Sequence, residues 1–198
     1  YVAYKDYNWM MSFTEKIIEK LAISVCGETK MQHQEKKINY KTPYKRISFF
    51  DAIKIETGDD ISNMTEKELF QYCKKQNIAT DKSMGRGKLF DAVFGHFCEK
   101  KLIQPTFIID YPIEMSPLTK PHRNNPALTE RFELFISGKE IANAYSEQNN
   151  PIEQKESFEE QIRLGQKGDD EAMLIDHDFL RAMEYGMPPT SGIGIGMD

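Results

Sequence analysis

Apolar residues recur at helical spacing over the first part of the chain. Every fourth residue from position 9 to position 25 is large and apolar: Trp9, Phe13, Ile17, Leu21 and Val25. This spacing places them along one face of an α-helix. The pattern predicts a long amphipathic helix over residues 4–26 that ends near Gly27. We expect its aromatic stripe to pack in the core rather than to form a binding site.

The next segment alternates between short strand-like runs and turn-forming residues. Candidate strands cover residues 30–34, 36–41 and 44–48, with turn-like or proline positions between them. We expect these strands to form a meander at the edge of a sheet.

Helical patterns return after residue 56. A capping-box pattern from Thr65 to Glu68 predicts a helix over residues 66–76, and a second helix is predicted over residues 87–101. The glycine-rich stretch 84–88 lacks the full spacing of a phosphate loop, so it favours an interhelical turn over a phosphate site. Residues 56–104 therefore read as a small helical insertion in a larger α+β domain.

The second half begins with an apolar strand over residues 106–110 and a proline-punctuated loop over 111–117. Residues 120–126 are basic and rich in turn formers; they could contact ATP phosphates or RNA, but the composition favours a solvated loop. Farther on, Asn150, Pro151 and Glu153 predict a helix start, with Gly165 closing that helix. Another helix is predicted over residues 178–185, and we expect both helices to pack against and brace a hairpin over residues 131–147.

Residues 131–147 form the most informative segment, because two alternating runs are hinged at Ser137-Gly138. Read as strands, they place Arg131 and Glu133 on one face, and Asn143, Tyr145 and Glu147 point the same way. A carboxylate suits an ammonium group and an amide can donate to a carboxylate, so this face suits a zwitterion with an extra positive charge.

Glu140 is the exception in this hairpin. It lies three residues from Asn143, so regular alternation turns it to the opposite face. A bulge or the hairpin bend would turn it back, and Glu133 with Glu140 would then suit Mg²⁺ carrying phosphates. The alternative interpretation of the whole segment is an acidic, exposed face of a half-buried sheet.

Glycine alternates with isoleucine near the end of the chain, from Gly192 to Gly196. Such a strand buries one face while the other lets a ligand approach the backbone closely. The alternative is a packed strand with bulges.

Composition narrows the class of protein. The 198 residues are 39% hydrophobic and 11% aromatic, as in a globular domain with a sizeable core. A net charge of -5 argues against broad nonspecific binding to nucleic acid but leaves contact through a locally basic face open. The three cysteines are widely spaced without a C-x-x-C motif, which indicates reduced thiols and a cytoplasmic protein. No apolar run approaches the length of a membrane span.

Three segments together resemble the catalytic domain of class II lysyl-tRNA synthetases: the hairpin, residues 168–173 and residues 183–198. The final run is similar to the family's motif 3 without the arginine expected after Asp198, and residues 1–4 are similar to the end of motif 2. We expect residues 1–198 to be part of one such catalytic domain, cut inside both motifs and inactive by itself. Motif 1 and the upstream anticodon-binding OB domain are expected to lie outside the chain.

The resemblance implies a fold and an activity. The fold would be α+β, with six or more mainly antiparallel strands flanked by helices. The activity would be that of a lysine-tRNA ligase, which uses ATP to activate L-lysine as lysyl-adenylate and transfers it to the 3' end of tRNA-Lys. The parent protein would be a homodimer, with Mg²⁺ accompanying ATP.

The resemblance also implies site residues, without a protein nucleophile or base. Those implied for ATP are Glu133, Glu140 and Gly196, with Glu133 and Glu140 as the metal ligands. Those implied for lysine are Tyr1, Asn143, Tyr145, Glu147 and Gly194.

Three alternatives stay open at this stage. The aspartyl and asparaginyl enzymes share the architecture, but Glu147 would repel an acidic substrate. A paralogue that attaches a β-lysine-type group to an elongation factor resembles the hairpin, but it typically lacks so long an insertion and has a bulkier residue near Gly194. A catalytically silent paralogue could keep the fold as an interaction module.

Overall fold

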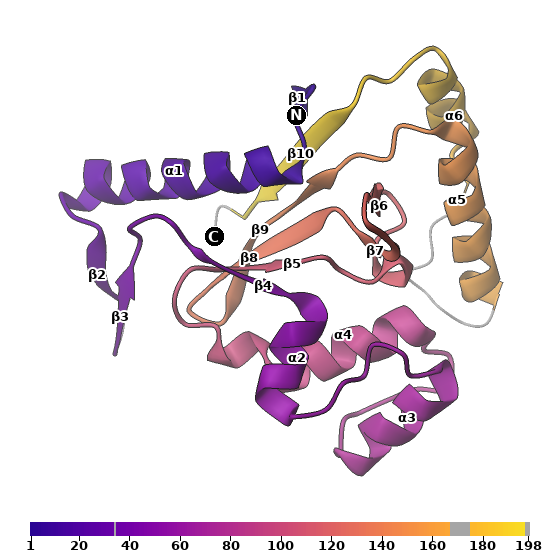
Figure 1. The fold of residues 1–198 in the computed structure, drawn as a ribbon, viewed down its shortest axis with the longest axis horizontal. Coiled ribbons are helices and arrows are strands. Elements are labelled where there is room, and N and C mark those ends of the chain that lie inside the picture. Colours follow the sequence, from indigo (N-terminus) through magenta and orange to yellow (C-terminus); the bar gives the residue numbers. More distant parts are fainter. Residues whose placement is uncertain (34, 167–174, 197–198) are drawn as a thin grey trace.

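The computed structural model describes residues 1–33, 35–166 and 175–196. Its centre is a six-stranded sheet in the order β1-β10-β9-β8-β5-β4 (Figure 1). Only the β4–β5 pair is parallel among these neighbours. The strands are β1 (Val2–Ala3), β4 (Lys45–Ser48), β5 (Thr106–Ile109), β8 (Arg131–Ile136), β9 (Lys139–Ser146) and β10 (Thr190–Ile195). The predicted α+β class with a mainly antiparallel sheet is confirmed.

Helix α1 (Tyr7–Cys26) packs on one face of this sheet. The Asp6 side chain caps its first turn by accepting from the Trp9 amide, so the helix begins at residue 7 rather than 4. Gly27 ends it with φ 79°, a left-handed conformation that glycine adopts without steric cost. Met10 and Met11 are buried there against the apolar face of β8.

The prediction that the aromatic stripe of α1 is core was wrong for much of its length. Phe13 is 39% exposed and Val25 is 79% exposed. Polar residues occupy the buried face instead: Thr14 donates to the Met10 carbonyl, and Glu15 accepts from the Tyr44 amide. A hydrophobic pattern cannot register buried polar residues that have hydrogen-bond partners.

The predicted meander of residues 30–48 was also wrong. β2 (Lys30–His33) and β3 (Lys36–Asn39) form a separate two-stranded sheet. β4 instead joins the main sheet and pairs in parallel with β5, whose residues come much later in the chain. Local alternation predicts that a strand exists, but it does not specify so distant a partner.

A helical unit packs on the sheet face opposite to α1, near the turn between β8 and β9 (Figure 1). Phe49, Phe90 and Phe94 form its core together with Ile108 and Phe135 from the sheet. The unit comprises α2 (Phe49–Thr57), α3 (Glu66–Lys75), α4 (Arg86–Phe97) and the 3-10 turn η1 (Glu99–Lys101).

Two features of this unit bear on the sequence predictions. The Thr65–Glu68 capping box is confirmed, with both reciprocal hydrogen bonds present. Helix α2 was missed and precedes the predicted 56–104 range, although Ser48 caps it and Gly58 ends it in the left-handed region.

The remaining elements border the strand ends near Glu147. The 3-10 turn η2 (Ile113–Met115) precedes a small hairpin of β6 (Pro121–His122) and β7 (Asn125–Thr129). Residues 120–126 are therefore largely part of a hairpin rather than a plain solvated loop.

Helices α5 (Pro151–Gln166) and α6 (His177–Glu184) pack on each other through Phe158, Leu180 and Met183. The expectation that they brace the 131–147 hairpin was wrong in its partner, because they contact the loop before β6 through Leu118 and Pro117. Gly165 does not close α5, which continues to Gln166.

Candidate active site

The register of the three central strands assembles the site. Arg131 pairs with Tyr145 and Tyr145 with Gly192, which makes one row across the sheet. In the next row Glu133 pairs with Asn143, and Asn143 with Gly194. Directly paired residues lie on the same face. The structure therefore brings these predicted residues together on one surface.

Glu140 reaches the same face through a bulge. Ser137 and Gly138 form the tight turn with φ 58° and 78°, as type I′ hairpins require. Phe135 pairs with Glu140 whereas Leu134 pairs with Ala142, so Ile141 is the extra residue. The condition set by the sequence for Glu140 is thus met.

Glu147 and Tyr1 meet above Gly192. A Cβ atom added to Gly192 would lie 2.2 Å from Glu147 Oε1 and 2.6 Å from Tyr1 Cε1. Only glycine leaves room for both groups at this distance from the backbone. Tyr1 arrives there because Val2 pairs with Ser191 at the sheet edge.

The electrostatics of this corner favour a cationic ligand. Burial raises the pKa of Glu147 to about 7. Burial and the charge of Glu147 also raise the pKa of Tyr145. An ammonium group placed here would favour the ionised carboxylate.

Glu133 is held by partners that sequence reasoning did not assign. Its Oε2 accepts from the Tyr111 hydroxyl at 2.6 Å, and its Oε1 accepts from Arg131 at 2.6 Å. Burial and the adjacent Glu133 raise the pKa of Tyr111 well above its usual value. Strand alternation places Arg131 on the same face as Glu133, so the sequence could have predicted this contact. Tyr111 lies in the loop after β5 and gave no such signal.

Glu133 and Glu140 fit a Mg²⁺ ion on chemical grounds. Desolvation by the surrounding protein and the charge of Glu133 raise the pKa of Glu140, although its side chain reaches solvent. A divalent cation relieves such repulsion. Within the described ranges no group of three or more protein ligands forms a metal cluster. Two carboxylates with phosphate oxygens are nevertheless a usual Mg²⁺ arrangement.

Gly194 and Gly196 leave the floor of the site open. A Cβ atom at Gly194 would meet nothing closer than the Asn143 carbonyl at 3.9 Å, and one at Gly196 nothing closer than the Ile141 carbonyl at 3.8 Å. Both glycines are exposed. Residues 168–173 and Asp198, which contributed to the resemblance, lie outside the described residues.

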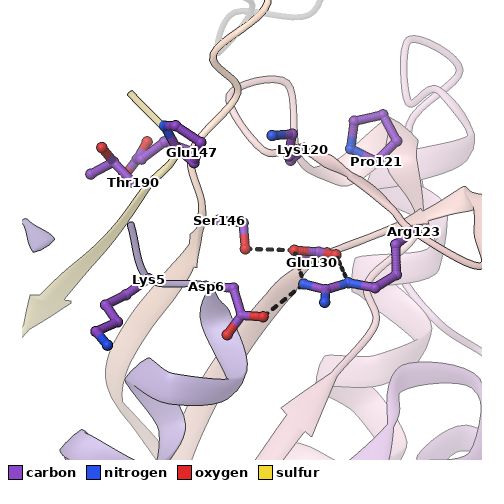
Figure 2. Close-up of a pocket in the computed structure, with 10 residues that line it drawn as sticks. Lys5, Asp6, Lys120, Pro121, Arg123, Glu130, Ser146, Glu147 and Thr190 are labelled. Atoms are coloured by element: carbon purple, nitrogen blue, oxygen red, sulfur yellow. Dashed lines mark hydrogen bonds and ion pairs between the residues drawn. The ribbon is translucent and has the colours of Figure 1, made fainter. Parts of the chain in front are cut away.

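A pocket of about 440 Å³ is lined in part by Glu147. Figure 2 shows Glu130 between Ser146 and Arg123, with Arg123 also reaching Asp6. Lys120 donates to Asn149 and Arg123 donates to Glu130. Both cations therefore have partners within the protein, which argues against the phosphate contact considered for residues 120–126. The glycine-rich stretch 84–88 starts α4, and Arg86 there bonds to the Ser62 and Met64 carbonyls.

The described part of the chain contains neither a membrane-crossing helix nor a disulfide. None of its helices is long and apolar enough to span a bilayer. Cys26, Cys73 and Cys98 are free thiols.

Comparison with known proteins gives a consistent result along the whole chain. The chain is 62% identical over 198 residues to a lysine-tRNA ligase of Porphyromonas gingivalis, 64% identical to one of Christiangramia forsetii and 58% identical to one of Azobacteroides pseudotrichonymphae. All of this chain is covered, but only 34%, 35% and 40% of those proteins, respectively. The chain thus spans between a third and two fifths of the length of these relatives. A sequence profile described as tRNA synthetases class II (D, K and N) matches residues 1–198, and with the antiparallel sheet it shows that the chain belongs to this family.

Proposed function

We propose that the chain forms part of the catalytic core of a lysine-tRNA ligase, called here the parent protein. In the first step the lysine carboxylate attacks the α-phosphorus of ATP, giving lysyl-adenylate and pyrophosphate. In the second step the lysyl group passes from the adenylate to a ribose hydroxyl of the terminal adenosine of tRNA-Lys, and AMP is released. The three relatives named above carry this activity in their names, and their identity to the chain supports the assignment.

The observation that carries the proposal is the environment of Glu147. Among the described residues, no Lys or Arg side chain lowers the pKa of this carboxylate. A half-buried carboxylate without a side-chain cation is suited to a ligand ammonium group. The same carboxylate would repel aspartate, which separates lysine from an acidic substrate of the same family.

The other site residues have complementary roles in this proposal. Tyr1 would close over the ammonium group of lysine, Tyr145 would form an aromatic wall of the pocket, and the Asn143 amide would donate to the lysine carboxylate. Glu133 and Glu140 would hold Mg²⁺, which neutralises charge on the ATP phosphates. Gly194 and Gly196 would let the substrates approach β10. Rate enhancement would come from alignment and charge neutralisation, without a protein nucleophile.

The parent protein would act in the cytoplasm as a homodimer with tRNA-Lys as its partner. These statements rest on the family resemblance. The face around Glu147 supports the amino-acid assignment only.

Exchange of labelled pyrophosphate into ATP tests the proposal. The parent protein should catalyse exchange with L-lysine and not with aspartate or asparagine. Preference for β-lysine would instead indicate the elongation-factor ligase, and exchange with no amino acid would indicate a silent interaction module. Glu147→Gln should weaken lysine binding far more than ATP binding, and equal losses measured by calorimetry would refute the ammonium role.

A further inference from the structure

Arg131 occupies the junction between the two proposed substrate regions. Its Nη2 donates to Glu133 Oε1 at 2.6 Å, and its Nε donates to Asn143 Oδ1 at 3.2 Å. One guanidinium group therefore contacts a residue proposed for Mg²⁺ and a residue proposed for lysine. Its planar array of donors can hold both in fixed directions.

The contact with Asn143 determines which end of the amide is available. Because Arg131 occupies Oδ1, the Nδ2 group is left as the donor, and it approaches Glu133 Oε1 at 3.4 Å. An amide side chain can otherwise rotate and present its oxygen. An oxygen facing a substrate carboxylate would repel it, so this orientation is needed for carboxylate binding.

Arg131 is itself fixed by the loop that leaves β5. Its Nη1 donates to the Met115 carbonyl at 2.8 Å and to Ser116 Oγ at 2.9 Å. Its guanidinium carbon lies 4.7 Å from the centre of the Tyr111 ring, in cation–π contact. With its donors engaged on three sides, the group has little freedom to move.

We propose that Arg131 is a positioning residue that couples lysine-carboxylate binding at Asn143 to metal binding at Glu133. This inference rests on the proposed function. Removing the guanidinium group takes away the donor that holds Glu133 Oε1 at 2.6 Å.

The test uses Arg131→Gln and Arg131→Lys in the parent protein. Ligands are L-lysine, L-lysinamide, which lacks the carboxylate, and MgATP, with binding measured by calorimetry. Arg131→Gln should weaken lysine binding about tenfold or more, the range for lost supporting hydrogen bonds around a site. Lysinamide binding should change less than about twofold, because Asn143 acts on the carboxylate alone. The Mg²⁺ concentration for half-maximal pyrophosphate exchange should rise, because Glu133 loses the donor that orients it.

Arg131→Lys keeps the charge but not the fork of donors, so it should restore only part of the lysine affinity. Arg123→Gln is the matched control, because Arg123 also pairs with a buried glutamate, Glu130, whose side chain is 4% exposed. This control should lower the unfolding temperature while leaving the ratio of lysine to lysinamide affinity unchanged.

The outcomes separate the inference from the function on which it rests. Equal losses of lysine and lysinamide binding in Arg131→Gln, with wild-type exchange intact, would overturn the positioning role alone. Wild-type protein that supports no lysine-dependent exchange and binds no lysine would overturn both. If Arg131→Gln does not fold, the same comparison is made with Arg131→Lys. That variant should still lose more affinity for lysine than for lysinamide, each compared with the wild-type protein.

Discussion

At the scale of single residues, Glu147 gives the proposed site a pH dependence. Burial raises its pKa to about 7, so the carboxyl is mostly protonated at pH 6 and mostly ionised at pH 8. Only the ionised form pairs with an ammonium group. Apparent lysine affinity should therefore increase about tenfold from pH 6 to pH 8, in proportion to the ionised fraction. Calorimetric titration of the parent protein with lysine at several pH values measures this change.

Glu147→Gln is the control for this prediction. Its side chain has nearly the same shape and does not titrate, so lysine affinity should be low and nearly constant between pH 6 and pH 8. A variant that kept the tenfold change would show that another group titrates.

Residue-level prediction from the sequence worked where chemistry follows strand alternation. Asn143 and Tyr145 share one face because they lie two positions apart on β9, and Glu133 joins them because it pairs with Asn143 across the bulged register. Tyr111 was missed because its hydroxyl reaches Glu133 from a loop 22 positions away. Loop geometry has no period, so no sequence pattern indicates such a contact.

At the scale of elements, the β8–β9 turn tests how the hairpin is held in register. Gly138 has φ 78°, and a Cβ atom there would lie 3.2 Å from Lys100 Cα. Gly138→Ala should lower the free energy of unfolding by about 1–2 kcal/mol, because a side chain is disfavoured in the left-handed region and the neighbouring backbone is close. Urea denaturation of the parent protein measures the loss.

Ser137→Gly is the matched variant in the same turn. Ser137 has φ 58°, so glycine relieves a disfavoured conformation there, and the substitution should be neutral or slightly stabilising. Equal destabilisation by both variants would show that the left-handed backbone conformation is not the cause of the loss.

Element prediction succeeded where local signals agreed and failed where partners are distant. The Thr65–Glu68 capping box and the Ser137-Gly138 hinge were read correctly because each is specified within a few residues. The parallel pairing of β4 with β5 joins residues 61 positions apart, such as Lys45 and Thr106. Such pairings depend on how the whole core packs and not on propensity.

At the scale of the whole molecule, the site draws on both ends of the chain and on the helical unit. Tyr1 lies over Gly192, while the helical unit is tied by Arg86 to Glu114 in the turn that precedes Ser116. A Cβ atom at Gly87 would be 2.9 Å from the Glu114 carbonyl, so the backbones are in close contact. The helical unit thus supports the same loop that holds Arg131.

Arg86→Gln tests this connection. Arg86 bonds to the Ser62 and Met64 carbonyls as well as to Glu114, so its loss leaves several acceptors without a partner. The free energy of unfolding should fall by about 1–3 kcal/mol, and hydrogen exchange should accelerate in residues 111–117. Lys54→Gln removes an exposed ion pair with Asp60 in the same unit, with side chains 56% and 54% exposed, and should leave the free energy of unfolding nearly unchanged. Faster exchange confined to the helices in Arg86→Gln would show that the helical unit is independent of the site loop.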